Sequence, residues 1–172
     1  MNDKPLVGFL VGSKSDLKFV EKGLRLLEEF GIAYELRVLS AHRSPELVAE
    51  YAGAAEAAGI KVIIAAAGAA AHLAGAIASR TTLPVVGVPI PSSELKGLDS
   101  LLSTVQMPSG VPVATMPIGE TGAANAAVLA AEILALTDSA LAEKLRRFRK
   151  GLAEKIEGEQ PRRSPTLESE AW

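Results

Sequence analysis

A histidine and an arginine stand side by side in residues 40–45, which have the sequence SAHRSP. The imidazole of His42 can give or take a proton near neutral pH, and the guanidinium of Arg43 can hold a phosphate. The alternative is a plain helix start, with Ser44 as N-cap and Pro45 as the first helical residue. Because that alternative gives the His–Arg pair no purpose, we predict proton transfer by His42 beside a bound phosphate.

Two serines and an aspartate follow the first apolar run of the chain, in residues 12–16 with the sequence GSKSD. Backbone N–H groups converge where a strand meets a helix, and the hydroxyls of Ser13 and Ser15 join them, so an anion or a sugar can bind. Asp16 repels a phosphate but can accept hydrogen bonds from ribose hydroxyls, which suits a nucleotide. Helix capping explains the same residues equally well, so both interpretations stay open here.

Very small side chains dominate residues 65–73, which have the sequence AAAGAAAHL. Such a loop lets the backbone at Gly68 and Ala70 approach a flat ligand closely. His72 stands at the expected start of a helix, where a histidine more often makes a structural hydrogen bond than takes part in catalysis. We therefore expect a structural role for His72.

A long connection over residues 89–100, continued by residues 106–110, is too elaborate for a simple link. Segments of this kind often cover a site. The alternative is a surface segment in which Asp99 and Ser100 only cap a short helix. Spacing alone does not separate the two.

The first of these loops follows a short apolar run at residues 6–11, as expected of a strand buried on both faces. Further strands are expected at residues 34–39, 61–66, 85–88 and 113–115. Helical spacing predicts helices over residues 15–30 and 45–58, and a third after Gly68. This alternation predicts an α/β fold: a single-domain, doubly wound parallel sheet, flavodoxin-like with three αβα layers, which binds ligands beyond the carboxyl ends of its strands.

Two helices of different character close the domain. Residues 122–136 are Ala-rich and apolar on every face, whereas residues 138–156 are charged and amphipathic. Because one small domain can cover few apolar helices, we expect these C-terminal helices to pack between subunits. We assign residues 1–156 to the domain and residues 157–172 to a polar tail.

The composition excludes several classes of protein. The 172 residues fit one domain, and 48% hydrophobic residues lie outside the range of disordered chains. A net charge of -2 offers no basic surface, so we expect no nucleic-acid partner. The chain has no cysteine and a polar N-terminal segment, so we expect no disulfide, no membrane partner and a cytoplasmic protein.

Together the four segments resemble the bacterial family of N5-carboxyaminoimidazole ribonucleotide mutases, which is related to the catalytic subunits of phosphoribosylaminoimidazole carboxylase. The resemblance covers residues 6–136 and rests on residues 12–16, 40–45, 70–73 and 97–108. It implies an isomerase of de novo purine biosynthesis that needs no metal and no cofactor and takes a small aminoimidazole ribonucleotide. It also implies a homo-octamer in which neighbouring subunits complete each site.

The reaction implied by the resemblance is a carboxylate transfer. The carbamate of the substrate loses CO2, ring carbon 4 attacks the trapped CO2, and a proton is then removed. His42 matches the family's acid–base residue, and an imidazole can serve in both directions at neutral pH. The resemblance assigns substrate binding to Ser13, Ser15, Asp16, Ser40, Arg43, Gly68, Ala69, Ala70 and Leu73, with ribose and phosphate at Ser13, Asp16, Ser40 and Arg43 and the ring near Gly68 and Ala70.

One loop departs from the family's usual sequence, because Ala66, Ala69 and Ala74 replace two glycines and a proline. A methyl group at Ala69 can alter the backbone conformation or crowd the ring. Three alternatives stay open. They are a carboxylase that uses free CO2 and typically has Lys in place of Arg43, a carboxylase of a pyridine-type dinucleotide, and a non-catalytic nucleotide-binding protein on the same fold.

Overall fold

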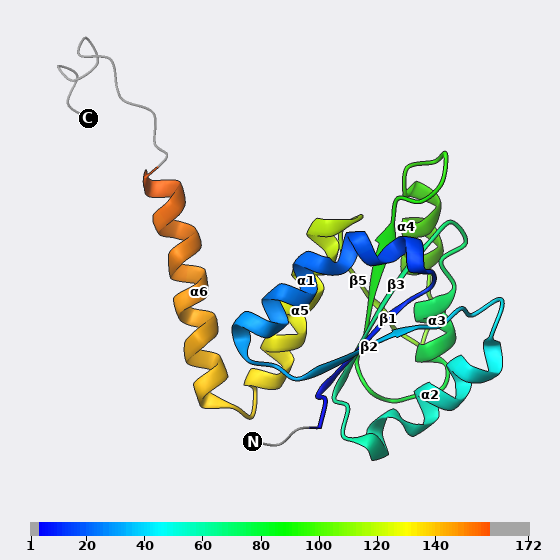
Figure 1. Cartoon of the computed structure of the whole chain (residues 1–172), viewed down its shortest axis with the longest axis horizontal. Helices are drawn as coiled ribbons and strands as arrows, with labels where there is room; N and C mark the ends of the chain where they lie inside the picture. The colour runs from blue at the N-terminus through cyan, green and yellow to red at the C-terminus, as the bar shows by residue number, and fades with distance from the viewer. Residues whose placement is uncertain (1–3, 159–172) are drawn as a thin grey trace, which may run out of the picture.

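A sheet of five parallel strands forms the centre of the computed structural model, which describes residues 4–158 (Figure 1). The strand order is β2-β1-β3-β4-β5. The strands are β1 (Val7–Val11), β2 (Tyr34–Val38), β3 (Val62–Gly68), β4 (Val85–Ile90) and β5 (Ala114–Thr115). Every pairing is parallel, so the predicted flavodoxin-like sheet is confirmed.

The central strands feed two apolar layers, because neighbouring residues of a strand point to opposite faces. In β3, Val62 and Ile64 pack in one layer, whereas Ile63 and Ala65 pack in the other. The first face carries α1 (Leu17–Phe30), α5 (Glu120–Ala135) and α6 (Ser139–Gly158), and the second carries α2 (Pro45–Ala58), α3 (Leu73–Ala78) and α4 (Leu98–Val105) (Figure 1). This arrangement confirms the three αβα layers.

Two glycines set the ends of the first helices. Gly31 ends α1 with φ 74° and Gly59 ends α2 with φ 103°, in the left-handed region that glycine adopts readily. The chain then turns directly into β2 and β3. These stops therefore fix where β2 and β3 can begin.

The Ala-rich helix α5 is covered within the chain, because it packs along α1. Its buried small residues are Gly122, Ala123, Ala124, Ala126, Ala127, Ala130 and Ala131. The composition of α5 therefore does not itself require a second subunit, and packing of the C-terminal helices between subunits stays a prediction. Helix α6 projects from the body and continues to Gly158, two residues beyond the predicted boundary, whereas the tail over residues 159–172 lies outside the described residues (Figure 1).

Close packing of α1 on α5 depends on Gly23. A Cβ at this position would overlap the backbone carbonyl group of Ala123. We expect Gly23→Ala to lower the free energy of unfolding, measured in urea, by about 1–3 kcal/mol, the usual cost of overpacking a core. In α2 a Cβ at Gly53 would meet no atom within 4 Å. Gly53→Ala should therefore raise the free energy of unfolding by up to about 1 kcal/mol, because alanine has the higher helix propensity. Equal stability of the two variants would contradict this packing.

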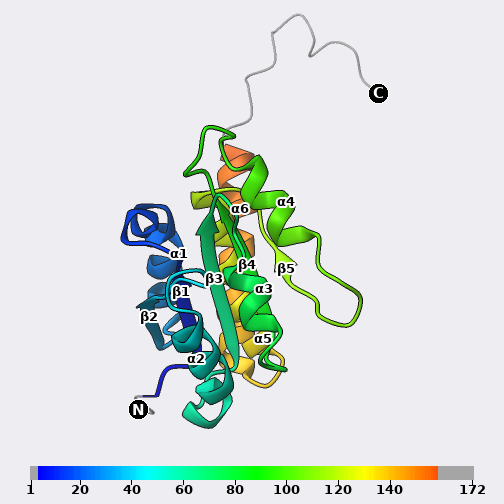
Figure 2. The ribbon, with the colours of Figure 1, turned by 90° about the vertical axis from the view of Figure 1, so that its right-hand side faces the viewer.

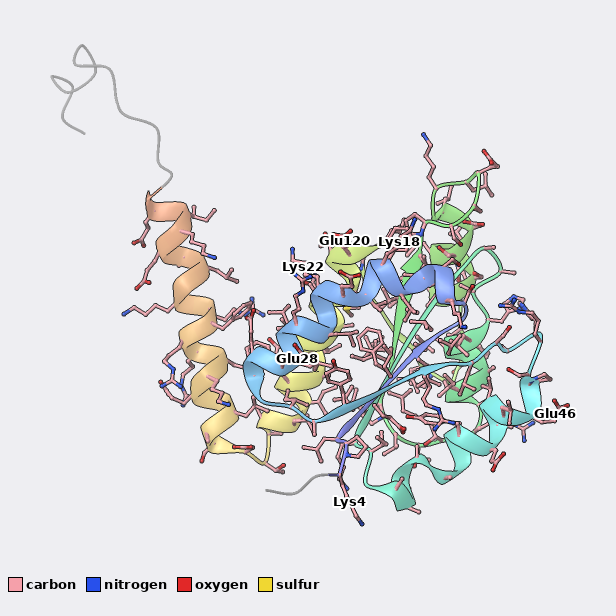
Figure 3. All side chains as sticks on the ribbon, viewed as in Figure 1. Lys4, Lys18, Lys22, Glu28, Glu46 and Glu120 are labelled. Atoms are coloured by element: carbon pink, nitrogen blue, oxygen red, sulfur yellow. The ribbon has the colours of Figure 1, made fainter. Side chains whose placement is uncertain are left out.

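Charged side chains lie on the outer sides of the helices. Lys18 and Lys22 project from α1, and Glu46 projects from the first turn of α2 (Figure 3). The apolar sides of these helices face the sheet, as expected of amphipathic surface helices. No helix within residues 4–158 combines the length and the apolar character that crossing a membrane requires.

Candidate active site

A polar cavity of about 390 Å³ opens at the carboxyl ends of β1, β2, β3 and β4. The predicted site residues that line it are Ser13, Ser15, Asp16, Ser40, His42, Arg43, Gly68, Ala70 and Leu73. Three loops that are distant in the sequence meet here, because parallel strands end at one edge of the sheet. The structure thus brings together every predicted site residue except Ala69, and their roles stay predictions.

Two further polar side chains reach the cavity without having been predicted to contact a ligand. Ser92 follows β4, and His72 precedes α3. For Ser92 the sequence provided one indication, because Ser92 belongs to the connection over residues 89–100 that was considered as a cover for the site. For His72 the expected structural hydrogen bond is present, and its partner is a residue of the site.

His42 and His72 face each other in the cavity. Nε2 of His42 lies 2.8 Å from Nδ1 of His72, and the rings meet edge to face with centroids 4.9 Å apart. One of these nitrogens must donate and the other must accept, so the contact holds a single proton between the two rings. The residue predicted to transfer a proton is thus held in place by a second imidazole.

Arg43 is anchored by acceptors from two loops. Its Nη2 donates to the carbonyl oxygen of Gly12 at 3.0 Å, and its Nε donates to Oγ of Ser40 at 3.3 Å. The hydroxyl of Ser44 does not cap α2, because it accepts from the N–H of Ser40 and donates to the Ser40 carbonyl oxygen. Helix α2 does begin directly after Ser44, but the hydroxyl closes the turn that presents the His–Arg pair.

The carboxylate of Asp16 is buried, with 4% of the residue exposed. Burial raises the pKa of this carboxyl above its usual value, although the Ser15 hydroxyl donates to Oδ1 at 3.3 Å and Arg43 lies near enough to lower it. Ser13 caps the following turn by accepting from the N–H of Ser15 at 3.4 Å, whereas Asp16 makes no cap bond to α1. Capping therefore explains Ser13 but not Asp16, and an unfavourably buried carboxylate in a cavity indicates ligand binding.

The small-residue loop is shaped by two local constraints. Gly68 has no room for a side chain, because the side chain of Ser92 lies directly over its Cα. Ala69 has φ 52°, in the left-handed region, which costs a residue with a Cβ about 1–2 kcal/mol. Ala69 thus adopts a conformation that favours glycine, and it does not line the cavity. The effect of its methyl group on a bound ring stays a prediction.

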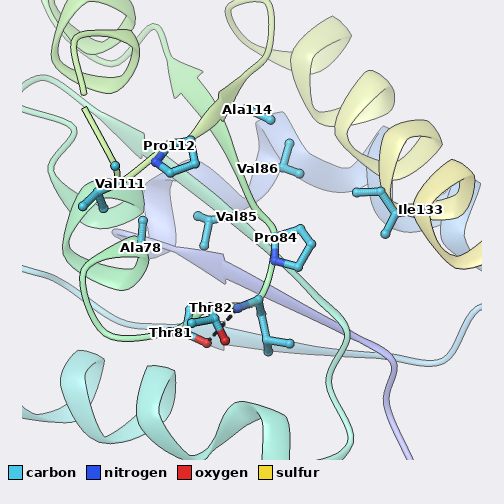
Figure 4. A pocket seen from close by; sticks show the side chains of 12 residues that line it. Ala78, Thr81, Thr82, Pro84, Val85, Val86, Val111, Pro112, Ala114 and Ile133 are labelled. Atoms are coloured by element: carbon cyan, nitrogen blue, oxygen red, sulfur yellow. Dashed lines mark hydrogen bonds between the residues drawn. The ribbon is translucent and has the colours of Figure 1, made fainter. Parts of the chain in front are cut away.

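A second cavity, of about 450 Å³, opens at the opposite ends of the strands (Figure 4). Its polar side chains are Thr81 and Thr82, and the hydroxyl of Thr81 accepts the N–H of Leu83 at 3.2 Å. No titratable side chain lines this cavity, so it offers no acid or base for a reaction.

Metal ligation was not expected from the sequence. Across residues 4–158, no three His, Asp or Glu side chains gather closely enough to hold a metal ion. A reaction without a metal or a cofactor stays a prediction, because substrates and neighbouring chains can also supply ligands.

A parallel sheet with two histidines in contact, a fixed guanidinium and a buried carboxylate at its carboxyl edge is typical of a flavodoxin-like α/β enzyme. More particularly, the chain belongs to the AIR carboxylase family, whose model matches residues 6–155.

Curated relatives and solved structures agree with this membership. The N5-carboxyaminoimidazole ribonucleotide mutase of Pyrococcus horikoshii is 54% identical over 171 residues, which cover 99% of this chain and 93% of the relative. The Bacillus subtilis protein of the same name is 56% identical over 142 residues, or 83% of this chain and 88% of the relative. The crystal structure of Treponema denticola PurE superimposes with a TM-score of 0.80 at 35% identity, covering 88% of this chain and 94% of that one.

Proposed function

We propose that this protein is an isomerase of de novo purine biosynthesis, which converts N5-carboxyaminoimidazole ribonucleotide into 4-carboxy-5-aminoimidazole ribonucleotide. The family match and the names of relatives more than half identical to this chain support the activity. The observation that carries the proposal is the contact of His42 with His72 beside Arg43 in one cavity. The reaction requires a group that gives a proton and takes one back next to a bound phosphate.

The cavity offers a suitable group for each part of the substrate. The guanidinium of Arg43 suits the phosphate, and the buried carboxylate of Asp16 suits the ribose hydroxyls. The small-residue loop before Leu73 provides a wall for the flat ring. Additional hydroxyl groups at the polar end come from Ser13, Ser15 and Ser40.

Proton transfer accompanies two carbon–carboxylate events. When the carbamate C–N bond breaks, CO2 leaves and His42 gives a proton to the nitrogen. Ring carbon 4 then forms a bond to CO2, and His42 removes the proton that this carbon carries. The proton balance of the whole reaction is zero, so one imidazole serves as acid and then as base. Retention of CO2 requires a closed site, which also excludes water.

His72 orients His42. Nε2 of His42 and Nδ1 of His72 share one hydrogen bond at 2.8 Å. The same bond holds the His42 ring in one orientation. We therefore assign His72 to positioning and His42 to proton transfer.

One comparison of substrates tests this function. The purified protein is mixed with N5-carboxyaminoimidazole ribonucleotide, without ATP or added metal, and separately with aminoimidazole ribonucleotide plus bicarbonate. Faster formation of product from the carbamate supports the mutase, whereas activity only with free CO2 identifies the direct carboxylase. Activity with neither substrate contradicts the proposal and directs attention to a pyridine-type dinucleotide or to nucleotide binding without catalysis.

We further propose that eight copies of the chain assemble and complete one another's sites. The resemblance to the mutase family supports the number. The association itself is supported by an apolar stripe along α4, with 53% of Leu98, 50% of Leu102 and 48% of Val105 exposed. Residues at i, i+4 and i+7 of a helix share one face, so this stripe is continuous.

Polar substitution of the stripe is expected to break the assembly. We expect Leu98→Lys combined with Leu102→Glu to reduce the mass measured by light scattering from that of eight chains to that of smaller species. Both side chains are exposed in the single chain, so the far-ultraviolet circular dichroism should be unchanged. A variant that keeps the wild-type mass would exclude α4 from the interface, and a monomeric wild type would contradict the assembly itself.

A cytoplasmic location is also proposed, because the nucleotide substrate is produced and consumed there. The negative net charge supports a small-molecule ligand over a nucleic acid. Cell fractionation followed by immunoblotting tests the location.

A further inference from the structure

A hydroxyl group from α4 reaches the loop that carries His72. Oγ of Ser103 accepts the backbone N–H of Ala71 at 3.0 Å, and it lies 3.4 Å from the carbonyl oxygen of Ala69. The same hydroxyl also lies 2.9 Å from the carbonyl oxygen of Asp99 in its own helix. A hydroxyl has one proton to donate and two lone pairs to accept with. Ser103 can therefore donate to the helix and accept from the loop at the same time.

The segment that Ser103 holds contains the strained residue of the site. Ala69 has a left-handed backbone, and the contacts of Ser103 lie directly after its Cα, at its own carbonyl oxygen and at the N–H two residues later. Because Ala71 is buried, its N–H has no ready access to water if Ser103 is lost. These contacts stabilise a conformation that the alanine itself disfavours.

The same turn sets the position of His72. The N–H of His72 donates to the carbonyl oxygen of Ala70 at 2.8 Å, so this tight turn fixes the backbone position of His72. Its Nδ1 then meets Nε2 of His42 at 2.8 Å. A change in the backbone at residues 69–71 therefore changes the contact between the two imidazoles.

We propose that Ser103 is a positioning residue, which fixes the turn at residues 69–71 and thereby the contact between His72 and His42. The effect of Ser103 on catalysis rests on the function proposed above, whereas its effect on the positions of the His42 and His72 rings does not. Helix α4 does not depend on Ser103 for its place in the fold, because the hydroxyl of Ser100 donates to the carbonyl oxygen of Ile90 in β4 at 3.0 Å. Helix α4 lies at the β4 side of the sheet (Figure 2).

The test compares two hydroxyl groups that are adjacent on α4. Ser103→Ala removes the contact with the loop. Thr104→Val is the matched control, because the Thr104 hydroxyl donates to Ser100 within the helix at 2.7 Å and none of its hydrogen bonds reaches the loop. A third variant combines Ser103→Ala with Ala69→Gly, since glycine adopts the left-handed conformation without the help of Ser103.

Two measurements are made on these proteins. Nitrogen-15 NMR of the histidine rings, recorded without substrate, reports the tautomers and the hydrogen bond between them. Kinetics with N5-carboxyaminoimidazole ribonucleotide report kcat and KM. For Ser103→Ala we expect altered ring-nitrogen shifts and a kcat about tenfold lower, with KM changed by about twofold at most, because misplacement of a catalytic group mainly affects the chemical step. Thr104→Val should match the wild type, and Ala69→Gly should restore part of the lost kcat.

The proposal and the proposed function fail in different ways. Wild-type ring-nitrogen shifts in Ser103→Ala would overturn the role of Ser103. So would a change in these shifts in Thr104→Val as large as that in Ser103→Ala. A wild-type protein that does not convert the carbamate would overturn the function, and the NMR comparison would still decide whether Ser103 positions the two histidines.

Discussion

Turnover of N5-carboxyaminoimidazole ribonucleotide will fall by about 10²- to 10⁴-fold in the variant His42→Asn, because this is the usual contribution of a general acid–base group. Asparagine is polar and of similar size near the backbone, but it cannot exchange a proton at neutral pH. Arg43 keeps its bonds to Gly12 and Ser40, so affinity for the ribonucleotide product should stay within about threefold of the wild type. Steady-state kinetics and isothermal titration calorimetry measure the two quantities.

Two control variants separate proton transfer from hydrogen bonding. The amide of His42→Gln reaches further than that of asparagine and can replace the bond of Nε2 to His72, yet it should be as inactive as His42→Asn. His72→Asn removes the positioning ring but leaves the imidazole of His42, so we expect a smaller loss of turnover. Near-normal turnover by His42→Asn, together with a large loss in His72→Asn, would transfer the acid–base role to His72.

Much of the fold was predictable because most strands are short apolar runs, whereas the edge strand β2 carries Glu35 and Arg37 and has no buried residue. The predicted strand at residues 6–11 and the observed β1, Val7–Val11, differ by one residue, since burial on both faces leaves few alternatives for such a run. Parallel topology then placed residues 12–16, 40–45 and 65–73 at one edge of the sheet. The meeting of these three loops in one site therefore followed from the strand positions and their parallel order.

Details of the site were not predictable, because they depend on how loops meet in space. The contact of His42 with His72 joins residues thirty positions apart, and no local pattern indicates their distance. Helix α4 begins directly after Gly97, whose lack of a side chain provides no cap, so its N-terminus was hard to predict from sequence. The burial of Asp16 was also not predictable, because an aspartate at a helix start is usually an exposed N-cap.

A change at Asp16 should improve stability while it removes function. Because burial raises the pKa of Asp16 in the folded chain above its value in the unfolded chain, the ionised carboxylate destabilises the folded state at neutral pH. We therefore expect Asp16→Asn to unfold at a higher temperature than the wild type at pH 7. Below the unfolded pKa, about 3.8, the carboxyl is neutral in both states, so the gain should disappear as the pH falls toward that value.

Ligand affinity should change in the opposite direction, because an amide cannot replace a carboxylate that accepts from two ribose hydroxyls. We expect the affinity for the ribonucleotide product to fall by about tenfold or more in Asp16→Asn, as for other hydrogen bonds to charged groups. Asp138→Asn is the matched control, since the Asp138 carboxylate accepts from the N–H groups of Ala140 and Leu141 at 3.0 Å and asparagine caps a helix equally well. A lower unfolding temperature with unchanged affinity in Asp16→Asn would assign the carboxylate to the fold, whereas a gain in stability with a loss in affinity indicates that this buried charge is kept for its ligand.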